Sequence, residues 1–516
     1  MLFNSFAFLF LFLPITAAVF FVLAKKSQGL AAGWLAAASL FFYGWWSLLY
    51  LPLLICSIVF NYWSGLRIAH ATGSARRYWL IFAIIIDLGL LAYFKYADFF
   101  ISTINAIAQS DVDALNIILP IGISFFTFTQ IAFLVDTYQE KVREYRFLHY
   151  LLFVTYFPHL IAGPVLHHKE MMPQFAEAAT YRLSLKNLAI GLSIFAIGLA
   201  KKVLIADNLA GHANFMFDQT EDPSLFIAWG GVLAYSFQLY FDFSGYSDMA
   251  IGLSRIFGIK LPLNFNSPYK AANVIEFWRR WHMTLSRFLR DYLYIALGGN
   301  RKGMVRRYSN LMATMVLGGL WHGASWNFVL WGALHGAYLI WNHAWIALAK
   351  RVGFPTSTKL WHALSVVLTF ISICFAWVFF RATDMATALI ILKGMIGGFG
   401  SSLPDSIGNQ LGPLKQQLED WGISFYLGGG ARFVQTYAWV LLAGAIAFSL
   451  PNTQQLMGRF EPALDYRFNG STAFTGSHKF ALVWQPNARW AAWIGILAVI
   501  SLLSINRPTE FLYFQF

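Results

Sequence analysis

Charged side chains are scarce in this chain of 516 residues. Asp, Glu, Lys and Arg together make up 12% of it, whereas hydrophobic residues make up 58%. A soluble domain carries about 25% charged residues, so a chain this depleted cannot cover its surface with side chains that water solvates well. The composition therefore excludes a soluble globular protein, and it excludes disordered and collagen-like chains as well. It indicates that lipid is the solvent.

Cysteines and linker-like segments are also nearly missing. Cys56 and Cys374 both lie in charge-free apolar stretches, where a thiol behaves as a small hydrophobic group. They do not indicate a disulfide framework. No Pro/Ser-rich or low-complexity segment separates the apolar runs. Length alone suggests about three soluble domains, but these features predict one membrane domain over residues 1–516.

Acidic residues are fewer than basic ones, with 24 Asp and Glu against 37 Lys and Arg, which gives a net charge of +13. In a soluble protein this balance would suggest a nucleic-acid partner. In a membrane protein it indicates cytoplasmic loops rich in Lys and Arg, which orient the helices and contact anionic lipid headgroups. We therefore expect the lipid bilayer as a partner and no nucleic acid.

Charge-free windows locate the membrane spans, because an apolar helix needs about 20 residues to cross the hydrocarbon layer. Residues 1–24 form such a window. The basic pair Lys25 and Lys26 follows it rather than precedes it, which predicts an uncleaved anchor with the amino terminus outside. The 40 residues from 27 to 66 predict two crossings, joined near an interfacial aromatic cluster of Tyr43, Trp45 and Trp46.

Later windows continue the pattern. A loop with Asp98, Asp111 and Asp113 contains no Lys or Arg, and it alternates with basic loops as positive-inside orientation requires. Residues 308–349 are again free of charge and long enough for two crossings. We predict an all-α, multi-pass membrane protein with about 11 to 13 membrane helices. Prolines within the windows predict that some of these helices are broken or re-entrant; they are Pro120, Pro158 and Pro164.

The segment 255–307 differs from the rest, because it holds eleven Lys and Arg but only two acids. In the stretch EFWRRWHMTLSRFLRDYLY (276–294), aromatic residues and leucines recur at helical spacing between the charges. This pattern predicts a basic amphipathic helix in the cytoplasmic interface, with its aromatics in the acyl region. It anchors the chain to lipid, or it forms a docking rim for an anionic cytosolic substrate such as the phosphates of coenzyme A. Candidate contacts for such a substrate are Arg279, Arg280, Arg287 and Arg290.

His322 is the most suggestive polar residue within a membrane window, where polar groups are costly and count as functional candidates. In LGGLWHGASW, Gly318 and Gly319 precede it, which on a helix would leave open volume beside the imidazole, with Trp321 and Trp326 as walls. Burial favours the neutral form of histidine, which is the form that a general base needs. The alternative is a neutral histidine bonded between helices, with the glycines serving close packing.

Four further polar residues are weaker candidates. His282, in the basic segment, either sits in the interface near water or assists the same site. Asp242 and Asp248 follow an apolar run, and we favour a role as helix caps. His335 is 13 residues beyond His322, roughly 220° around a straight helix, so it faces elsewhere unless the helix breaks.

Metal and nucleotide motifs are missing. The chain has no G-x-S-x-G elbow, no P-loop and no H-E-x-x-H. The histidines His159, His167 and His168 do not have the spacing of zinc ligands. We therefore expect no catalytic metal.

Six stretches stand out, in this order along the chain: LPIGISFFTFTQIAFLVDTY (119–138), FPHLIAGPVL (157–166), LYFDFSGYSDMAIGL (239–253), NFNSPY (264–269), EFWRRWHMTLSRFLRDYLYIALGGNRKG (276–303) and LGGLWHGASWNFVLWGALHG (317–336). Together they resemble the membrane-bound O-acyltransferase (MBOAT) family, and more narrowly its bacterial branch that acetylates exported polysaccharides such as alginate. The resemblance is specific over residues 30–385, the expected core with both histidines, and it is thin over the helices and polar loops of residues 386–516.

The resemblance implies a ring of tilted helices around a thinned centre, with a funnel or tunnel that leads to His322. It implies that His322 is the essential histidine and His282 the second catalytic residue. Members of the family transfer an acyl group from a thioester to a hydroxyl. The expected substrate-binding residues are Arg279, Arg280, Trp281, Trp321 and Asn266.

For this branch the resemblance implies a location in the bacterial inner membrane and no bound cofactor. The donor would be acetyl-CoA or another acyl thioester from the cytosol, and periplasmic acetyltransferase or acceptor proteins would be partners. Alginate, cellulose and peptidoglycan remain open as the polymer, which is acetylated directly or through those partners. Alternatives are D-alanyl transfer to a cell-envelope polymer, a polymer or acyl exporter without chemistry of its own, and a scaffold that recruits acetylation enzymes.

Overall fold

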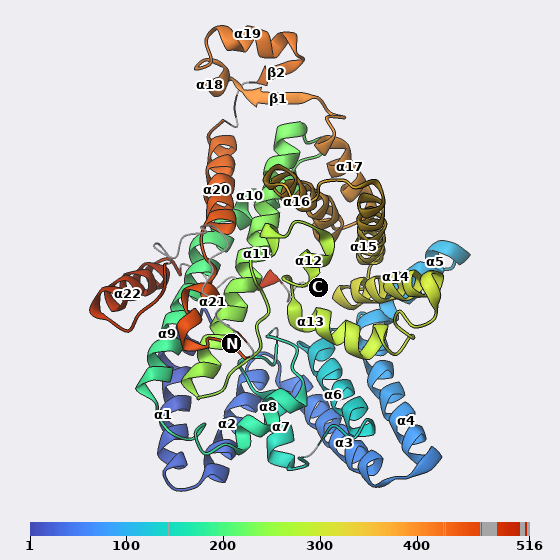
Figure 1. The fold of residues 1–516 in the computed structure, drawn as a ribbon, viewed down its shortest axis with the longest axis vertical. Helices are drawn as coiled ribbons and strands as arrows, with labels where there is room; N and C mark the ends of the chain where they lie inside the picture. The colour runs from blue at the N-terminus through green and yellow to red at the C-terminus, as the bar shows by residue number, and fades with distance from the viewer. Residues whose placement is uncertain are drawn as a thin grey trace.

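The computed structural model describes residues 1–142, 144–161, 163–426, 428, 430–464, 466, 482–505 and 511–512. Over these residues the fold is almost entirely helical. The exception is a parallel pair of strands, β1 (Ser401–Pro404) and β2 (Ile423–Tyr426), which pairs Ser401 with Ile423 and Pro404 with Tyr426. The predicted all-α class is therefore confirmed. Figure 1 shows α1 to α4 at one end of the molecule, the strand pair with α18 and α19 at the other, and α11 between them.

The helices follow one another closely along the chain. In order they are α1 (Leu13–Ala24), α2 (Gln28–Gly44), α3 (Leu51–His70), α4 (Gly73–Leu91), α5 (Ala97–Ala108), α6 (Ile123–Tyr138), α7 (Phe147–Thr155), α8 (His168–Ala176), α9 (Leu185–Ala200), α10 (Asp207–Gln219), α11 (Leu225–Ile256), α12 (Val274–Trp278), α13 (Met283–Phe288), α14 (Gly303–His322), α15 (Trp326–Val352), α16 (Lys359–Arg381), α17 (Met385–Met395), α18 (Asp405–Gly408), α19 (Pro413–Asp420), α20 (Gly430–Ser449), α21 (Thr453–Leu456) and α22 (Ala488–Leu503).

Short turns of other helical types interrupt or extend these helices. Four are π-helical turns, which occur mostly as single turns inside α-helices and frequently at functional sites. They are Phe8–Phe12, Ala92–Tyr96, Lys201–Ala206 and Leu289–Tyr294. The turn Ala92–Tyr96 joins α4 to α5, and the turn Lys201–Ala206 joins α9 to α10. Each pair therefore forms one uninterrupted helical segment.

Five helical segments among the described residues are long and apolar enough to cross a membrane. They are Leu48–His70, Gly73–Ala108, Leu185–Gln219, Lys359–Arg381 and Gly430–Ser449. Shorter apolar helices accompany them at Phe8–Ala24, Met385–Met395 and Ala488–Leu503. The chain is thus a multi-pass membrane protein, while 11 to 13 crossings stay a prediction. The charge-poor stretch 147–168 folds as the short helix α7 followed by a loop with Pro158 and Pro164, rather than as one membrane-spanning helix.

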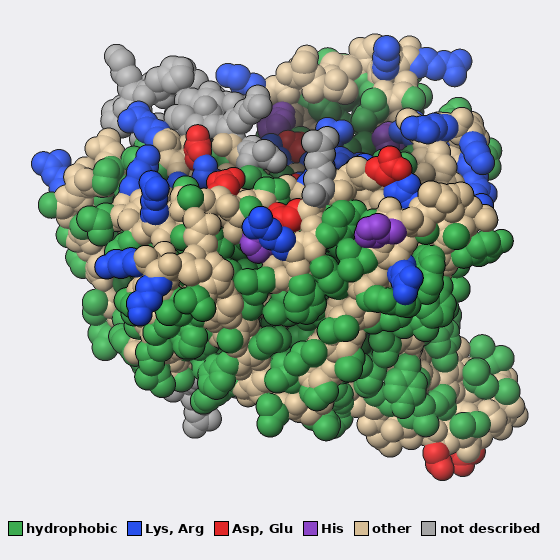
Figure 2. Space-filling model, turned by 90° about the horizontal axis from the view of Figure 1, so that it is seen from below, with side chains coloured by type: hydrophobic (Ala, Val, Ile, Leu, Met, Phe, Trp, Pro, Cys, Tyr) green, Lys and Arg blue, Asp and Glu red, His purple; other side chains and the backbone are tan. Residues whose placement is uncertain are grey.

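The outer surface fits this environment. In Figure 2, Lys and Arg side chains gather mostly along one edge of the face that is seen, and hydrophobic side chains form a broad band beside them. Many large apolar side chains are exposed on the described helices, among them Phe82 and Ile85 on α4 and Leu441 on α20. A protein with such a band needs lipid around it, because water would contact these side chains at a high cost.

Helix α11 forms the centre of the fold. From Gly230 onward every one of its residues is buried except Leu233, and it packs against α9, α10, α16, α17 and α20. Its contact with α9 is close because glycines face each other. A Cβ atom on Gly198 of α9 would lie 2.6 Å from the carbonyl oxygen of Gly245 on α11. Close backbone approach at small residues is typical of helix packing in membranes.

Asp242 and Asp248 lie within α11 rather than at its end, so the expectation that they cap a helix is wrong. Both pair with lysines of the π-helical turn after α9. Lys202 Nζ lies 2.7 Å from Asp242 Oδ1 and 2.8 Å from Asp207 Oδ1, and Lys201 Nζ lies 2.6 Å from Asp248 Oδ2. These pairs let charged side chains stay inside the helix bundle, because each ammonium faces at least one carboxylate.

The basic segment also differs from the prediction. It is not one amphipathic helix, because the chain breaks at His282, which has a φ of 41°, and forms α12, α13 and a π-helical turn instead. Its aromatics are buried in the protein, with Phe277 at 1% and Trp281 at 3% exposure, rather than in the acyl region of lipid. Lipid anchoring by these rings is therefore excluded, because they pack against other parts of the chain.

A first prediction concerns the contact between α9 and α11. Replacement of Gly198 by Val places methyl groups against the backbone of α11 and should destabilise the protein by about 1–3 kcal/mol. The measurement is the midpoint of thermal unfolding of the detergent-purified protein. Gly89→Val on α4 is the matched control, because a Cβ there meets nothing within 4 Å. Equal unfolding midpoints for the two variants would contradict close packing at Gly198.

A second prediction concerns orientation. Positive-inside placement puts the acidic loop after α5 outside and the loop between α3 and α4 inside. With Cys56 and Cys374 replaced by Ser, the exposed positions Ala114 and Ser74 can each carry a single cysteine. We expect Ala114→Cys to react with a membrane-impermeant maleimide in intact cells, and Ser74→Cys to react only after the membrane is opened. The reverse pattern would invert the topology.

Candidate active site

His322 is the last residue of α14, and the helix ends there because Gly323 adopts an extended conformation. After this break α15 begins at Trp326, and the two helices pack along each other. The glycines around His322 serve this packing rather than open volume beside the imidazole. A Cβ on Gly319 would clash with the carbonyl of Phe328, and one on Gly323 would clash with the ring of Phe328. The prediction of space left by these glycines is therefore wrong.

Aromatic rings surround the imidazole of His322, which is 4% exposed. Its ring centroid lies 5.0 Å from that of Trp321, 5.1 Å from Trp331 and 5.2 Å from Phe380, and each of these rings is nearly perpendicular to it. We call these three rings the aromatic enclosure. Its effect is to exclude water from most of the imidazole surface. Trp326, which we expected as a second wall, is instead 56% exposed and contacts Phe99.

His335 joins this cluster because the helix breaks between the two histidines. Its ring lies 4.7 Å from Trp331, which itself touches His322, and its Nδ1 accepts a hydrogen bond from Trp278 Nε1 at 3.3 Å. A straight helix would have turned His335 away. The break after His322 therefore brings a third histidine to the back of the aromatic enclosure.

His282 lies beside His322, with the two ring centroids 6.5 Å apart. It is 1% exposed and sits at the start of α13. Its Nδ1 lies 3.1 Å from Oδ1 of Asn264, and the same atom of Asn264 accepts from the backbone N–H of Thr284 at 3.3 Å. Because a backbone N–H only donates, this atom is an oxygen, and His282 Nδ1 must carry the hydrogen that binds it. In the neutral ring, Nε2 then holds the lone pair.

A cleft of about 120 Å³ reaches His322. We call it the Lys95 cleft; it is lined by Trp46, Lys95, residues 119–125, Ile161, Trp321 and His322. Lys95 belongs to the π-helical turn between α4 and α5, and its ammonium donates to the carbonyl oxygens of Trp321 at 2.6 Å and His322 at 3.1 Å. The cleft therefore gives small groups a route to this residue.

Trp321 connects this cleft to the basic segment. Its ring stacks on Phe128 of α6 at 5.2 Å, and Phe128 stacks in turn on Phe288 of α13 at 4.3 Å. Tyr292 continues the row at 4.9 Å from Phe288, and its hydroxyl donates to Asp136 Oδ2 at 2.8 Å. A continuous row of aromatic rings thus runs from the histidine pair to the hydroxyl of Tyr292 on the basic segment.

The predicted substrate-binding residues are only partly brought together. Arg280 and Asn266 are joined, because Asn266 N–H donates to the carbonyl of Arg280 at 2.9 Å, and Trp281 lies 5.0 Å from Phe265. Arg279 is exposed. Arg280 is already paired with Glu276 at 2.6 Å. The other two candidate arginines are also paired, Arg287 with Glu170 at 2.6 Å and Arg290 with Asp291 at 2.7 Å.

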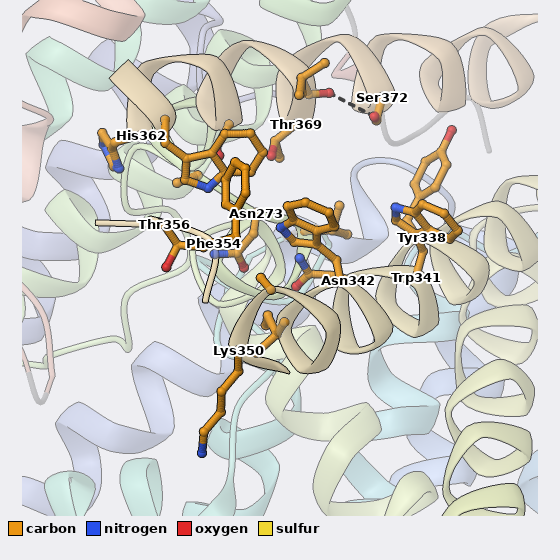
Figure 3. A pocket seen from close by; sticks show the side chains of 18 of the residues that line it. Asn273, Tyr338, Trp341, Asn342, Lys350, Phe354, Thr356, His362, Thr369 and Ser372 are labelled. Atoms are coloured by element: carbon orange, nitrogen blue, oxygen red, sulfur yellow. Dashed lines mark hydrogen bonds between the residues drawn. The ribbon is translucent and has the colours of Figure 1, made fainter. Parts of the chain in front are cut away.

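A larger cavity, of about 810 Å³, lies elsewhere, between α15, α16 and the start of α12. Figure 3 shows Tyr338, Trp341 and Asn342 on one of its sides and Thr369 and Ser372 on the other. Neither His322 nor His282 lines it. Size alone therefore does not identify the site of chemistry. Within the described parts of the chain, no group of three or more His, Cys, Asp and Glu residues has the arrangement of a metal site.

Sequence reasoning did not find Lys95, Tyr96 or Asn264. Lys95 stands alone in the aromatic stretch AYFKY at the end of a predicted span, and a single lysine at such a place is a signal that could have been used. Asn264 begins the stretch NFNSPY, but nothing in its spacing indicates that it reaches His282, which is 18 residues away. That contact depends on how the loop before α12 folds back.

Comparison with known proteins places this arrangement among acyltransferases. The model of the membrane-bound O-acyltransferase family matches residues 30–385, which include both histidines and Lys95. The chain is 49% identical to a peptidoglycan O-acetyltransferase of Helicobacter pylori over 78% of this chain and 81% of that protein. It is 38% identical to a probable alginate O-acetylase of Pseudomonas aeruginosa over the full length of both chains.

A more distant relative is a teichoic acid D-alanyltransferase of Bacillus subtilis, which is 28% identical over 51% of this chain and 69% of that protein. The family model and the two closer relatives agree with the resemblance carried by the sequence motifs. The match covers the break after α14, the histidine pair and the loop that holds Asn264. This chain is a membrane enzyme that belongs to the membrane-bound O-acyltransferase family.

Proposed function

We propose that the protein passes acetyl groups from a cytosolic thioester donor, acetyl-CoA, across the bacterial inner membrane for O-acetylation of an exported polysaccharide. The observation that carries this proposal is the position of His322 between the aromatic enclosure and the Lys95 cleft. An acetyl group as cargo is supported by the names of the two closer relatives, an O-acetyltransferase and a probable O-acetylase. Alginate and peptidoglycan are the polymers in those names.

The proposed reaction is a general-base acyl transfer. Neutral His322 takes the proton of the acceptor hydroxyl while the hydroxyl oxygen attacks the carbonyl carbon of the thioester. The C–S bond then breaks, the new ester forms, and the thiolate receives the proton back from the imidazolium and leaves as a thiol. A positioned base of this kind contributes roughly 10²- to 10⁴-fold in rate. The aromatic enclosure supports it, because dry surroundings keep the imidazole uncharged.

His282 is proposed as the second catalytic residue. Asn264 fixes its tautomer, so that Nε2 is the acceptor atom of the ring. The two imidazoles lie on adjoining sides of the same aromatic cluster, with Phe243 at 4.7 Å from His282. We assign to His282 the role of orienting the acyl donor, which approaches from the side of the basic segment.

The two substrates are proposed to approach from opposite sides. The Lys95 cleft lies next to residues 119–125, directly after the acidic loop, and positive-inside orientation places this loop outside. The acceptor hydroxyl enters there, delivered by a periplasmic partner protein or by the polymer. The basic segment lies on the other side, where Arg279, Arg280 and Trp281 would meet the donor. An exposed arginine suits the phosphates of such a donor.

A third prediction tests the general base. His322→Ala and His322→Gln should each lower polymer acetylation by roughly 10²-fold or more, because neither side chain accepts a proton at neutral pH. The measurement is ester-linked acetate per unit of polymer, with membrane insertion checked by immunoblot. His362→Gln, an exposed histidine on α16, is the matched control and should keep normal acetate. Unchanged acetate in His322→Gln would leave only an exporter or a scaffold.

Mass spectrometry of the same polymer separates the acyl groups. An added acetyl group supports the proposal, whereas D-alanyl esters would support the rival transfer known from the name of the more distant relative. Both groups are carried as thioesters or related activated acyls, so the histidine variants alone cannot distinguish them. The polymer mass can.

A fourth prediction tests how His282 is held. Asn264→Leu removes the oxygen that fixes Nδ1–H and should lower the acetylation rate by about 10- to 100-fold, since loss of an orienting partner typically has this effect. Asn264→Asp keeps an acceptor oxygen and should retain more activity than Leu. The measurement is the initial rate of polymer acetylation in cells with equal protein levels. A Leu variant as active as the Asp variant would contradict the orienting role.

A further inference from the structure

The last turn of α14 is held from outside by two consecutive residues. Tyr96 Oη donates to the carbonyl oxygen of Leu320 at 2.8 Å, and Lys95 Nζ donates to those of Trp321 and His322 at 2.6 and 3.1 Å. The final carbonyls of a helix have no partner within the helix. In a protein surrounded by lipid they must find one elsewhere, and these two side chains supply it.

Lys95 differs from Lys201 and Lys202 in the groups that its ammonium contacts. Lys201 and Lys202 each face a carboxylate. Among the residues that the structure describes, no ion pair includes Lys95, and no Asp or Glu lines its cleft. Its partners are the negative end of the α14 dipole and, at 3.4 Å, the hydroxyl of Ser124. A half-buried cation without a carboxylate partner is costly in a protein surrounded by lipid, which points to a role other than stability.

The position of Lys95 follows from the local backbone. A π-helical turn, Ala92–Tyr96, replaces the α-helix where α4 joins α5, and both donors come from the end of this turn. The residues they hold include Trp321, which walls the Lys95 cleft, and His322 itself. A shift of this turn therefore moves the imidazole relative to the cleft.

We propose that Lys95 is a positioning residue for acyl transfer, which holds the carbonyls of Trp321 and His322 and thereby sets the His322 imidazole at the inner end of the Lys95 cleft. This inference rests on the proposed function of His322. Without the ammonium, the end of α14 loses the hydrogen bonds that Lys95 donates to two carbonyls, and the imidazole loses this hold on its position between the two substrates. Displacement of a catalytic group by about 1 Å can cost about 10²-fold in rate.

A fifth prediction tests this role with the full-length protein in liposomes. Acetyl-CoA is the donor probe on one side of the liposome membrane. The release of free thiol is measured with and without a small alcohol as acceptor on the opposite side of that membrane. Lys95→Met should lower kcat by about 10²-fold, while the KM for acetyl-CoA stays within about twofold because the donor side is untouched. Lys95→Arg should regain part of kcat, since it restores a cation with donors.

Two further variants complete the test. Tyr96→Phe removes one bond to the same turn and should lower kcat less than Lys95→Met does. Lys393→Met is the matched control, because that lysine lies over the ring of Phe399 at 4.5 Å, outside the site. A chemical readout accompanies the kinetics: the rate at which diethyl pyrocarbonate modifies His322, followed by mass spectrometry, should change severalfold in Lys95→Met and stay constant in Lys393→Met.

The outcomes separate the two proposals. Normal kcat in Lys95→Met, with His322→Gln inactive, would overturn the positioning role and leave the proposed function standing. Full activity of His322→Gln would overturn the proposed function itself. A higher KM with unchanged kcat would also overturn the inference, because it would make Lys95 a binding residue. If Lys95→Met does not insert, the kcat values of Lys95→Arg and Tyr96→Phe decide, and normal values in both contradict the proposal.

Discussion

Lipid leaves a broken helix without water to satisfy its backbone, and this constraint shapes the centre of the protein. The break after His322 exposes the carbonyls at the end of α14, which Lys95 and Tyr96 bind. The same break turns α15 back along α14 and brings His335 behind the imidazole. His322, the proposed base, thus lies where the regular helix ends, and the residues that bind the helix end are the ones proposed to hold the histidine in position.

Buried charges in this chain follow two different arrangements. Lys201 and Lys202, which lie against α11, each face a carboxylate of that helix. Asp242 also accepts a hydrogen bond from the backbone N–H of Leu512 at 3.0 Å. These groups tie the bundle to the carboxyl-terminal part of the chain. At the active site, Lys95 faces carbonyl oxygens instead. A paired charge inside a helix bundle supports specific packing. A cation held only by dipoles keeps an electrostatic field that acts on reacting groups nearby.

The surroundings of His322 differ on its two sides. On one side lie the rings of Trp331 and Phe380 and, 6.5 Å away, the imidazole of His282. On the other side lies a cleft of about 120 Å³, room for roughly four water molecules. In the proposed reaction, a narrow cleft would admit a hydroxyl group on a slender arm and keep bulk water away from the thioester. This asymmetry suits a reaction in which transfer to the acceptor must win over hydrolysis.

The sequence by itself determined the class of the protein and singled out His322 as the candidate base. Few charges and long apolar windows required helices in lipid, because only helices satisfy their own backbone there, and the motif around His322 indicated the acyltransferase family. Tertiary structure alone decided the rest. It interrupted the basic segment at His282, turned its rings inward and moved Asp242 from an expected cap to an ion pair with Lys202. It also joined Lys95 to a helix end 226 residues away. Periodicity reports which face of one helix is apolar, but which polar groups meet inside the bundle depends on how several helices pack, and no local pattern records that.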